Sequence, residues 1–66
     1  MTNSEKASCE LMDIVKVLVA QRFHLVEFYV GKCNLPMAAR ERLGNVEVAI
    51  KEAIREIKAA IAEVQA

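Results

Sequence analysis

The chain lacks tryptophan, and its 66 residues include only two cysteines, one histidine and one proline. Cys9 and Cys33 are too few for a disulfide framework, and adding His24 does not complete the four ligands of a structural zinc site. The net charge is zero, so the chain as a whole does not attract nucleic acid or an anionic membrane. Chains of this length rarely bury enough core to fold alone, and oligomerisation is therefore the support that we expect.

Long uninterrupted hydrophobic runs are also absent. The most hydrophobic stretch, residues 11–30, is long enough to span a bilayer, but four charged residues and a histidine interrupt it, and each is costly in hydrocarbon. Residues 1–6 contain no basic segment followed by an apolar one, which disfavours a secretory signal. We expect a cytoplasmic protein with reduced thiols and no membrane association.

Hydrophobic residues recur at the helical intervals of three and four on both sides of one turn sequence, Gly-Lys-Cys-Asn-Leu-Pro at residues 31–36. Gly31 suits a left-handed C-cap, and Pro36 suits the first turn of a following helix. The sequence therefore predicts a single all-α domain, residues 1–66, folded as an antiparallel two-helix hairpin. The expected elements are a helix at about 3–30, a turn at about 31–35 and a helix at about 36–64.

Two local sequences concern the start and the continuity of these helices. Thr2 and Glu5 have the spacing of a capping box at the start of the first helix. Gly44 is the weak point of the second helix, because glycine inside a helix costs about 1 kcal/mol and Asn45 can cap a new helix. We expect one continuous second helix, with a break at Gly44 as the alternative.

The two helices differ in the width of their apolar surfaces. Apolar residues cover about half of the circumference of the first helix, which is more than one partner helix can bury. The second helix has a narrower aliphatic stripe flanked by Ala49, Ala53 and Ala60, which allow another backbone to approach closely. The simplest way to bury the remaining apolar surface is a homodimer of two hairpins that form a four-helix bundle with coiled-coil-like packing.

Two charged residues break this hydrophobic pattern. Arg22 lies at the centre of the apolar face of the first helix, and Glu47 lies in the hydrophobic seam of the second. In a hairpin that turns near Asn34, facing residues have numbers that sum to about 68 or 69, which places Arg22 opposite Glu47. We predict a partly buried interhelical ion pair that fixes the register, as buried polar groups do in coiled coils.

Large hydrophobes on the first helix outside the centre of the seam form a candidate interaction surface. They are Met12, Val17, Val19, Phe23, Val26, Phe28 and Val30. Cys9 and Cys33 lie near opposite ends of that helix and cannot pair within one chain. They are candidates for a bridge between two antiparallel chains, and ordinary reduced thiols are the alternative.

Motifs that support catalysis are missing from the sequence. It contains no glycine-rich phosphate loop, nucleophile elbow, paired inward carboxylates or Glu-x-x-His metal motif. His24 falls on the polar face without a second histidine or cysteine nearby, which is typical of a solvated surface residue. We expect no catalytic residue, no metal, no cofactor and no enzymatic activity.

Two short stretches resemble known families of helical hairpins. Met1-Thr2-x-x-Glu5-Lys6, together with the chain length and the two-helix layout, resembles the plasmid RNA-binding hairpin that regulates copy number, although the core and the outer polar residues follow another pattern. The run Val-Glu-Val-Ala-Ile at residues 46–50, after a Gly-x-Cys-x-x-Pro turn, is similar to the second helix of the small co-chaperones of type III secretion needles. That resemblance implies a subunit completed by a different protein. The first helix here is far more hydrophobic than in that family, and we assign the chain to neither.

The sequence thus favours a small, non-enzymatic interaction module, an adaptor or regulatory protein, that oligomerises through its apolar helix faces. Its expected partners are a second copy of itself and another protein. The alternative is an obligate subunit or co-chaperone whose apolar first helix lies in the groove of a different protein. An RNA-binding hairpin is the least favoured alternative, because binding through phosphates needs a positive charge that the neutral chain does not have.

Overall fold

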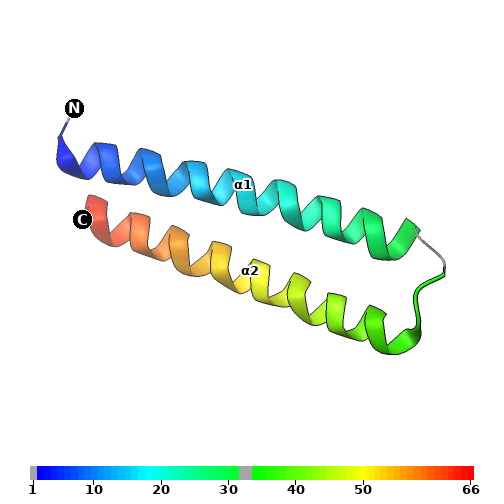
Figure 1. Ribbon diagram of the computed structural model, residues 1–66. Helices are drawn as coiled ribbons and strands as arrows, with labels where there is room; N and C mark the ends of the chain where they lie inside the picture. Colours follow the sequence, from blue (N-terminus) through cyan, green and yellow to red (C-terminus); the bar gives the residue numbers. More distant parts are fainter. Residues whose placement is uncertain (1, 32–33) are drawn as a thin grey trace.

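The chain folds as two long antiparallel helices joined at one end (Figure 1). A computed structural model describes residues 2–31 and 34–66, and over these residues it contains helix α1 (Asn3–Gly31), helix α2 (Met37–Gln65) and no strand. The two chain ends lie together at the end of the molecule opposite the turn. The predicted all-α hairpin is confirmed, with each helix within one residue of the expected bounds.

The start of α1 is fixed by Thr2. Its Oγ1 accepts a hydrogen bond of 3.1 Å from the backbone N–H of Glu5, and its carbonyl accepts one of 3.0 Å from Lys6. The side-chain bond satisfies one of the N–H groups that the first helical turn leaves unpaired. The Glu5 carboxylate also lies in the first turn, where the helix dipole favours negative charge. The half of the predicted capping box that involves the Thr2 side chain is therefore present.

The turn differs from its prediction in two details. The expected left-handed C-cap at Gly31 is wrong, since no glycine in the described ranges has a positive φ and Gly31 forms the last residue of α1. Pro36 occupies the N-cap rather than the first helical turn, with φ −59° and ψ 151°, and its carbonyl accepts the N–H of Arg40 at 3.1 Å. Proline fits this position because its fixed φ suits the entry to the helix and an N-cap needs no N–H donor.

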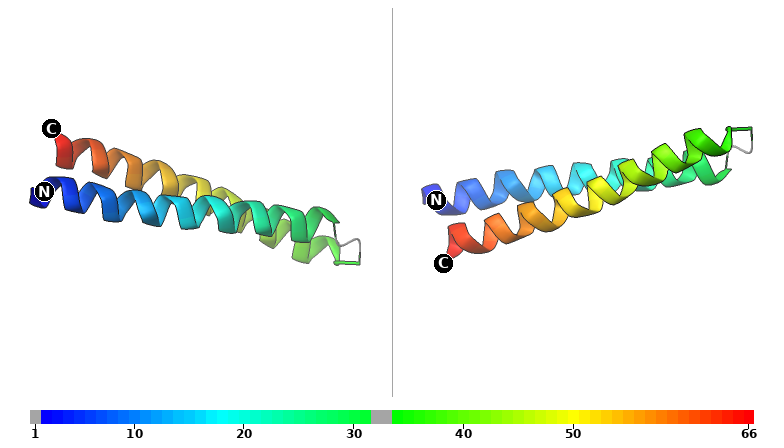
Figure 2. Two further views of the ribbon diagram at one scale, coloured as in Figure 1. Left: turned by 90° about the horizontal axis from the view of Figure 1, so that it is seen from above. Right: turned by 90° about the horizontal axis from the view of Figure 1, so that it is seen from below.

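The hydrophobic seam between the helices is thin. Among the described residues, Val15 of α1 and Ile54 of α2 are the two buried hydrophobes, with 3% and 9% of their surface exposed, and Ser8 is also buried. The helices cross at a shallow angle along their length (Figure 2), and the Cα positions extend over 49 × 15 × 9 Å. The radius of gyration is 15.3 Å, whereas a compact domain of this length has about 11 Å. The hairpin is thus an elongated unit in which each helix buries only one side.

The alternative of a break at Gly44 is wrong, because α2 runs without interruption through it. Gly44 has no positive φ, and a Cβ atom added there would meet nothing within 4 Å. Glycine is therefore the less stable choice at this position, where an alanine would fit and would lose less backbone entropy on folding.

Replacing Gly44 by alanine should raise the stability of the hairpin. We expect a gain of about 0.4–1 kcal/mol in the free energy of unfolding, measured by urea denaturation followed by circular dichroism. A loss of stability instead would mean that a second backbone packs against Gly44 in the assembled protein, with no room for a methyl group.

Candidate functional site

A polar cluster interrupts the hydrophobic seam in the half of the hairpin nearer the turn. Glu47 of α2 accepts hydrogen bonds from two residues of α1. Arg22 Nε donates to its Oε2 at 3.4 Å, and the Tyr29 hydroxyl donates to its Oε1 at 2.5 Å. Lys51, one turn further along α2, places Nζ 3.6 Å from Oε2. The Arg22 and Glu47 side chains are 33% and 17% exposed, so the pair is partly buried.

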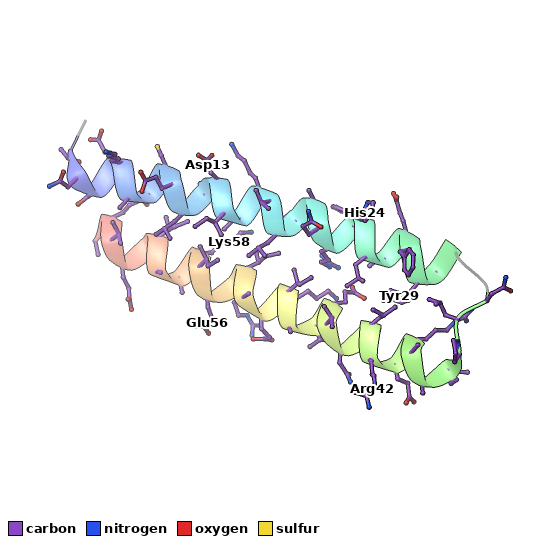
Figure 3. All side chains as sticks on the ribbon, in the orientation of Figure 1. Asp13, His24, Tyr29, Arg42, Glu56 and Lys58 are labelled. Carbon is purple, nitrogen blue, oxygen red and sulfur yellow. The ribbon has the colours of Figure 1, made fainter. Side chains whose placement is uncertain are left out.

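Helix geometry explains how these residues meet. Arg22 and Tyr29 are seven residues apart and so lie on one face of α1, and Glu47 and Lys51 are separated by one turn of α2. Figure 3 shows Tyr29 reaching from α1 toward α2. The contact between Arg22 and Glu47 is the one that the register predicts. Tyr29 and Lys51 were not predicted as members of the cluster, although their spacing from Arg22 and Glu47 places them on the same helix faces.

The cluster shifts the titration of two of its members in opposite directions. The hydrogen bond from Tyr29 lowers the pKa of the Glu47 carboxyl below its ordinary value of 4.5, burial opposes this, and Arg22 and Lys51 lower the pKa further. The same hydrogen bond raises the pKa of Tyr29 above 10.0, together with burial and the Glu47 charge, while Arg22 acts against this rise. At every pH between the pKa of Glu47 and the pKa of Tyr29, the structure favours an ionised Glu47 and a protonated Tyr29.

The melting temperature should fall at both ends of the pH range. A lowered carboxyl pKa gives stability that is present above pH 4.5 and lost as the pH falls toward the folded-state value. A raised phenol pKa gives stability that is present below pH 10.0 and lost as the pH rises through the folded-state value. Tyr29 is the only tyrosine, so phenolate absorbance measures its titration directly. A midpoint at or below 10.0 would contradict the contact with Glu47, and Tyr29→Phe is the control for the alkaline loss.

The chemistry of the cluster is that of a structural contact, because both oxygens of Glu47 already accept from neighbouring donors. Within residues 2–31 and 34–66, no group of three or more His, Cys, Asp and Glu side chains is placed to hold a metal ion. His24 lies on the edge of α1 away from α2 (Figure 3) and lines an open hollow of about 370 Å³ with Glu27, Phe28 and Gly31. The absence of enzymatic activity stays a prediction.

One side of the hairpin has a groove with an apolar floor and a basic rim. A hollow of about 360 Å³ lies between the helices and is lined by Val19, Arg22, Lys51, Ile54, Arg55 and Lys58. A second, separate hollow of about 290 Å³ lies nearer the chain ends and is lined by Ser8, Cys9, Met12, Asp13, Lys16, Ile61 and Gln65. We call the two hollows together the basic groove.

The opposite side of the hairpin is uncharged along most of its length. Because the basic groove occupies one flank of each helix, helical spacing places the other flanks together on the second side. The residues on that side are Ala7, Ile14, Leu18, Gln21, Leu25 and Phe28 of α1 and Ala39, Val46, Ala53, Ile57, Ala60 and Val64 of α2. Ile14 and Val46 are 47% and 46% exposed. We call this side the uncharged face.

The predicted interaction residues do not form one surface. Met12 and Val19 line the basic groove, and Phe23 and Val30 follow on the same flank of α1 with 61% and 65% of their surface exposed. The other three differ: Val26, seven residues after Val19, is half-buried on that flank, Phe28 follows Ile14 by fourteen residues on the opposite flank, and Val17 is 58% exposed on the outer edge of α1. The prediction used apolarity alone, and the spacing of Lys51, Arg55 and Lys58 was the signal that separates the two sides.

The candidate thiols are only partly described by the structure. Cys9 is a free, exposed cysteine on α1 beside the second hollow of the basic groove. Cys33 lies outside the described residues, so an intermolecular bridge between Cys9 and Cys33 stays a prediction.

Comparisons of the chain with protein-family profiles, with curated proteins and with solved structures find no match. Neither described helix combines the length and the apolarity needed to cross a membrane. The function must therefore be inferred from the two sides of the hairpin and from the cluster between its helices.

Proposed function

We propose that the protein is a non-enzymatic interaction module that forms a homodimer through its uncharged face and presents the rest of its helical surface to another macromolecule. The observation on which this rests is an excess of exposed apolar surface. Among the residues that the structure describes, nine large hydrophobic side chains are exposed, and Ile14 and Val46 of the uncharged face are two of them. These side chains lie on more than one side of the hairpin, and the uncharged face is the side where Ile14 and Val46 have half-buried apolar neighbours and no charged rim, as association sites usually do.

The amount of exposed surface supports the same proposal. The hairpin exposes 5134 Å², whereas a compact monomer of its mass, 7.3 kDa, exposes about 4,200 Å². The excess is close to the roughly 800 Å² that each partner buries in a standard protein interface. A second hairpin packed on the uncharged face would remove this excess and would give α1 and α2 the second buried side that they lack.

The side chains of the uncharged face suit a helical partner. Val46, Ala53 and Ala60 recur every seven residues along α2, and the two alanines allow a neighbouring backbone to approach closely. Ile14, Leu18 and Leu25 supply larger side chains on the adjacent flank of α1. A twofold dimer places the same face of both copies in contact, so an uncharged, self-complementary surface is what it requires.

A matched pair of α2 variants tests the dimer. Val46→Glu introduces a carboxylate on the uncharged face. Val48→Glu introduces one at a position that is 56% exposed and that, seven residues before Arg55, lies on the opposite flank of α2. Light scattering under reducing conditions should give a dimer for the unmodified chain and for Val48→Glu, and a monomer for Val46→Glu. The unmodified chain should also melt at a higher temperature at higher concentration.

Two results would overturn the proposal. A well-folded monomer at every concentration would mean that the uncharged face is stable in water. An unfolded or polydisperse chain that becomes helical only with a different protein would instead identify an obligate subunit, which is the alternative that the apolar first helix suggested.

A further inference from the structure

From the basic groove we infer that the hairpin binds an acidic amphipathic helix of a partner protein on the side opposite its dimer contact. The inference rests on the proposed function, because the partner must find this side open when the uncharged faces are paired. It adds the chemistry of the partner and the residues that recognise it.

The groove combines an apolar floor with an excess of positive charge. Val19 and Ile54 form the floor of the first hollow, and the other four lining residues are the cations Arg22, Lys51, Arg55 and Lys58. Within residues 2–31 and 34–66, two carboxylates contact these cations: Glu47 is within 3.6 Å of Arg22 and Lys51, and Glu52 is 3.7 Å from Arg55. A chain without net charge thus concentrates positive charge on one flank of α2.

The dimensions of the groove fit a helix. Met12 and Val19 are seven residues apart on α1, and Ile54 and Ile61 are seven apart on α2, so the floor extends over about 10 Å, or two helical turns. A bound amphipathic helix places apolar anchors at positions i, i+3 or i+4, and i+7 over the same distance. Acidic residues beside these anchors would meet the basic rim of the first hollow. The second hollow is lined by both Lys16 and Asp13 and adds no net charge.

A second copy of the chain does not fit this groove. In a twofold contact the basic rim of one hairpin would face the identical rim of the other, and like charges across an interface are strongly disfavoured. A nucleic acid backbone would match the charge but would leave Met12, Val19 and Phe23 uncovered. An acidic amphipathic helix covers the apolar floor and neutralises the rim together.

A displayed library of amphipathic helices tests the proposal directly. Its apolar positions are fixed, and its flanking positions are randomised among Glu, Gln and Lys. Selection on the unmodified hairpin should enrich Glu, and selection on Arg55→Glu/Lys58→Glu should enrich Lys. The reversed variant should bind the selected acidic helix about tenfold more weakly or worse, and binding to the unmodified hairpin should weaken with added salt.

Control variants separate this proposal from the dimer. Lys6→Glu/Arg42→Glu makes the same change in net charge, and Figure 3 shows Arg42 on the edge of α2 away from α1. This control should bind the selected helix as the unmodified chain does, and all variants should keep the dimer mass and the helical circular dichroism spectrum. A monomeric unmodified chain that still binds the selected helix would refute the proposed function alone.

Three results would overturn the inference itself. The first is that the unmodified hairpin and Arg55→Glu/Lys58→Glu select the same helices. The second is that a correctly folded dimer enriches no helix from the library. The third is that an oligonucleotide binds more tightly than any selected helix, through Arg55 and Lys58.

Discussion

Replacing Ile54 by alanine should leave the hairpin largely unfolded at low concentration. Ile54 is one of only two buried hydrophobes in the described chain, with 9% of its surface exposed. Removing a buried isoleucine side chain to alanine costs about 2–5 kcal/mol, and a core of this size rarely supplies more than about 3–5 kcal/mol in total. Circular dichroism during thermal and urea denaturation should therefore show a small, non-cooperative signal for Ile54→Ala and a cooperative transition for the unmodified chain.

Two valines of α1 provide a matched control for this interpretation. Val15 is 3% exposed and Val17 is 58% exposed, so the same substitution to alanine tests burial at two nearby positions of one helix. Val15→Ala should lose about 2 kcal/mol, and Val17→Ala should stay within about 0.5 kcal/mol of the unmodified chain. Equal losses at both positions would mean that Val17 is buried in the assembled protein and that α1 has a further contact on its outer edge.

The fold was predictable because its rules are local. The three-four spacing of hydrophobes defined both helices, and Thr2, Gly31 and Pro36 marked their ends to within one residue. The conformation of Gly31 was not predictable in the same way, since glycine adopts right- and left-handed backbone equally well and the residue type does not select between them. The continuity of α2 at Gly44 depended on the stability of the whole helix, which outweighs the cost of one glycine.

The polar cluster was predictable only in part. Arg22 and Glu47 are each a charged residue in an otherwise hydrophobic pattern, and the hairpin register places them opposite each other. Tyr29 broke no pattern, because its ring is apolar enough for the seam while its hydroxyl lies far enough from the backbone to reach Glu47 on the other helix. The two sides of the hairpin were missed for a different reason: the prediction considered apolar residues alone, whereas the cations Lys51, Arg55 and Lys58 on one flank of α2 are what distinguishes the sides.

Removing the Glu47 carboxylate should strongly destabilise the hairpin, whereas replacing its whole cluster by apolar residues should not. In Glu47→Ala, the Arg22 guanidinium loses its partly buried counter-ion and the Tyr29 hydroxyl loses its acceptor. A polar group left without a partner costs more than the contact contributed, because its desolvation is no longer offset. We expect the melting temperature to fall by about 10 °C or more in a chain of this length.

The variant Arg22→Leu/Tyr29→Phe/Glu47→Leu distinguishes a register-fixing cluster from one that mainly adds stability. It keeps the volume of the seam and leaves no polar group unpaired, so its melting temperature should match or exceed that of the unmodified chain. If the cluster fixes the register, as its position between two otherwise hydrophobic faces suggests, the apolar variant should give a broader set of backbone amide signals by NMR. A melting temperature as low as that of Glu47→Ala, with one sharp set of signals, would instead mean that the three residues contribute stability and leave the register to Val15, Ile54 and their hydrophobic neighbours.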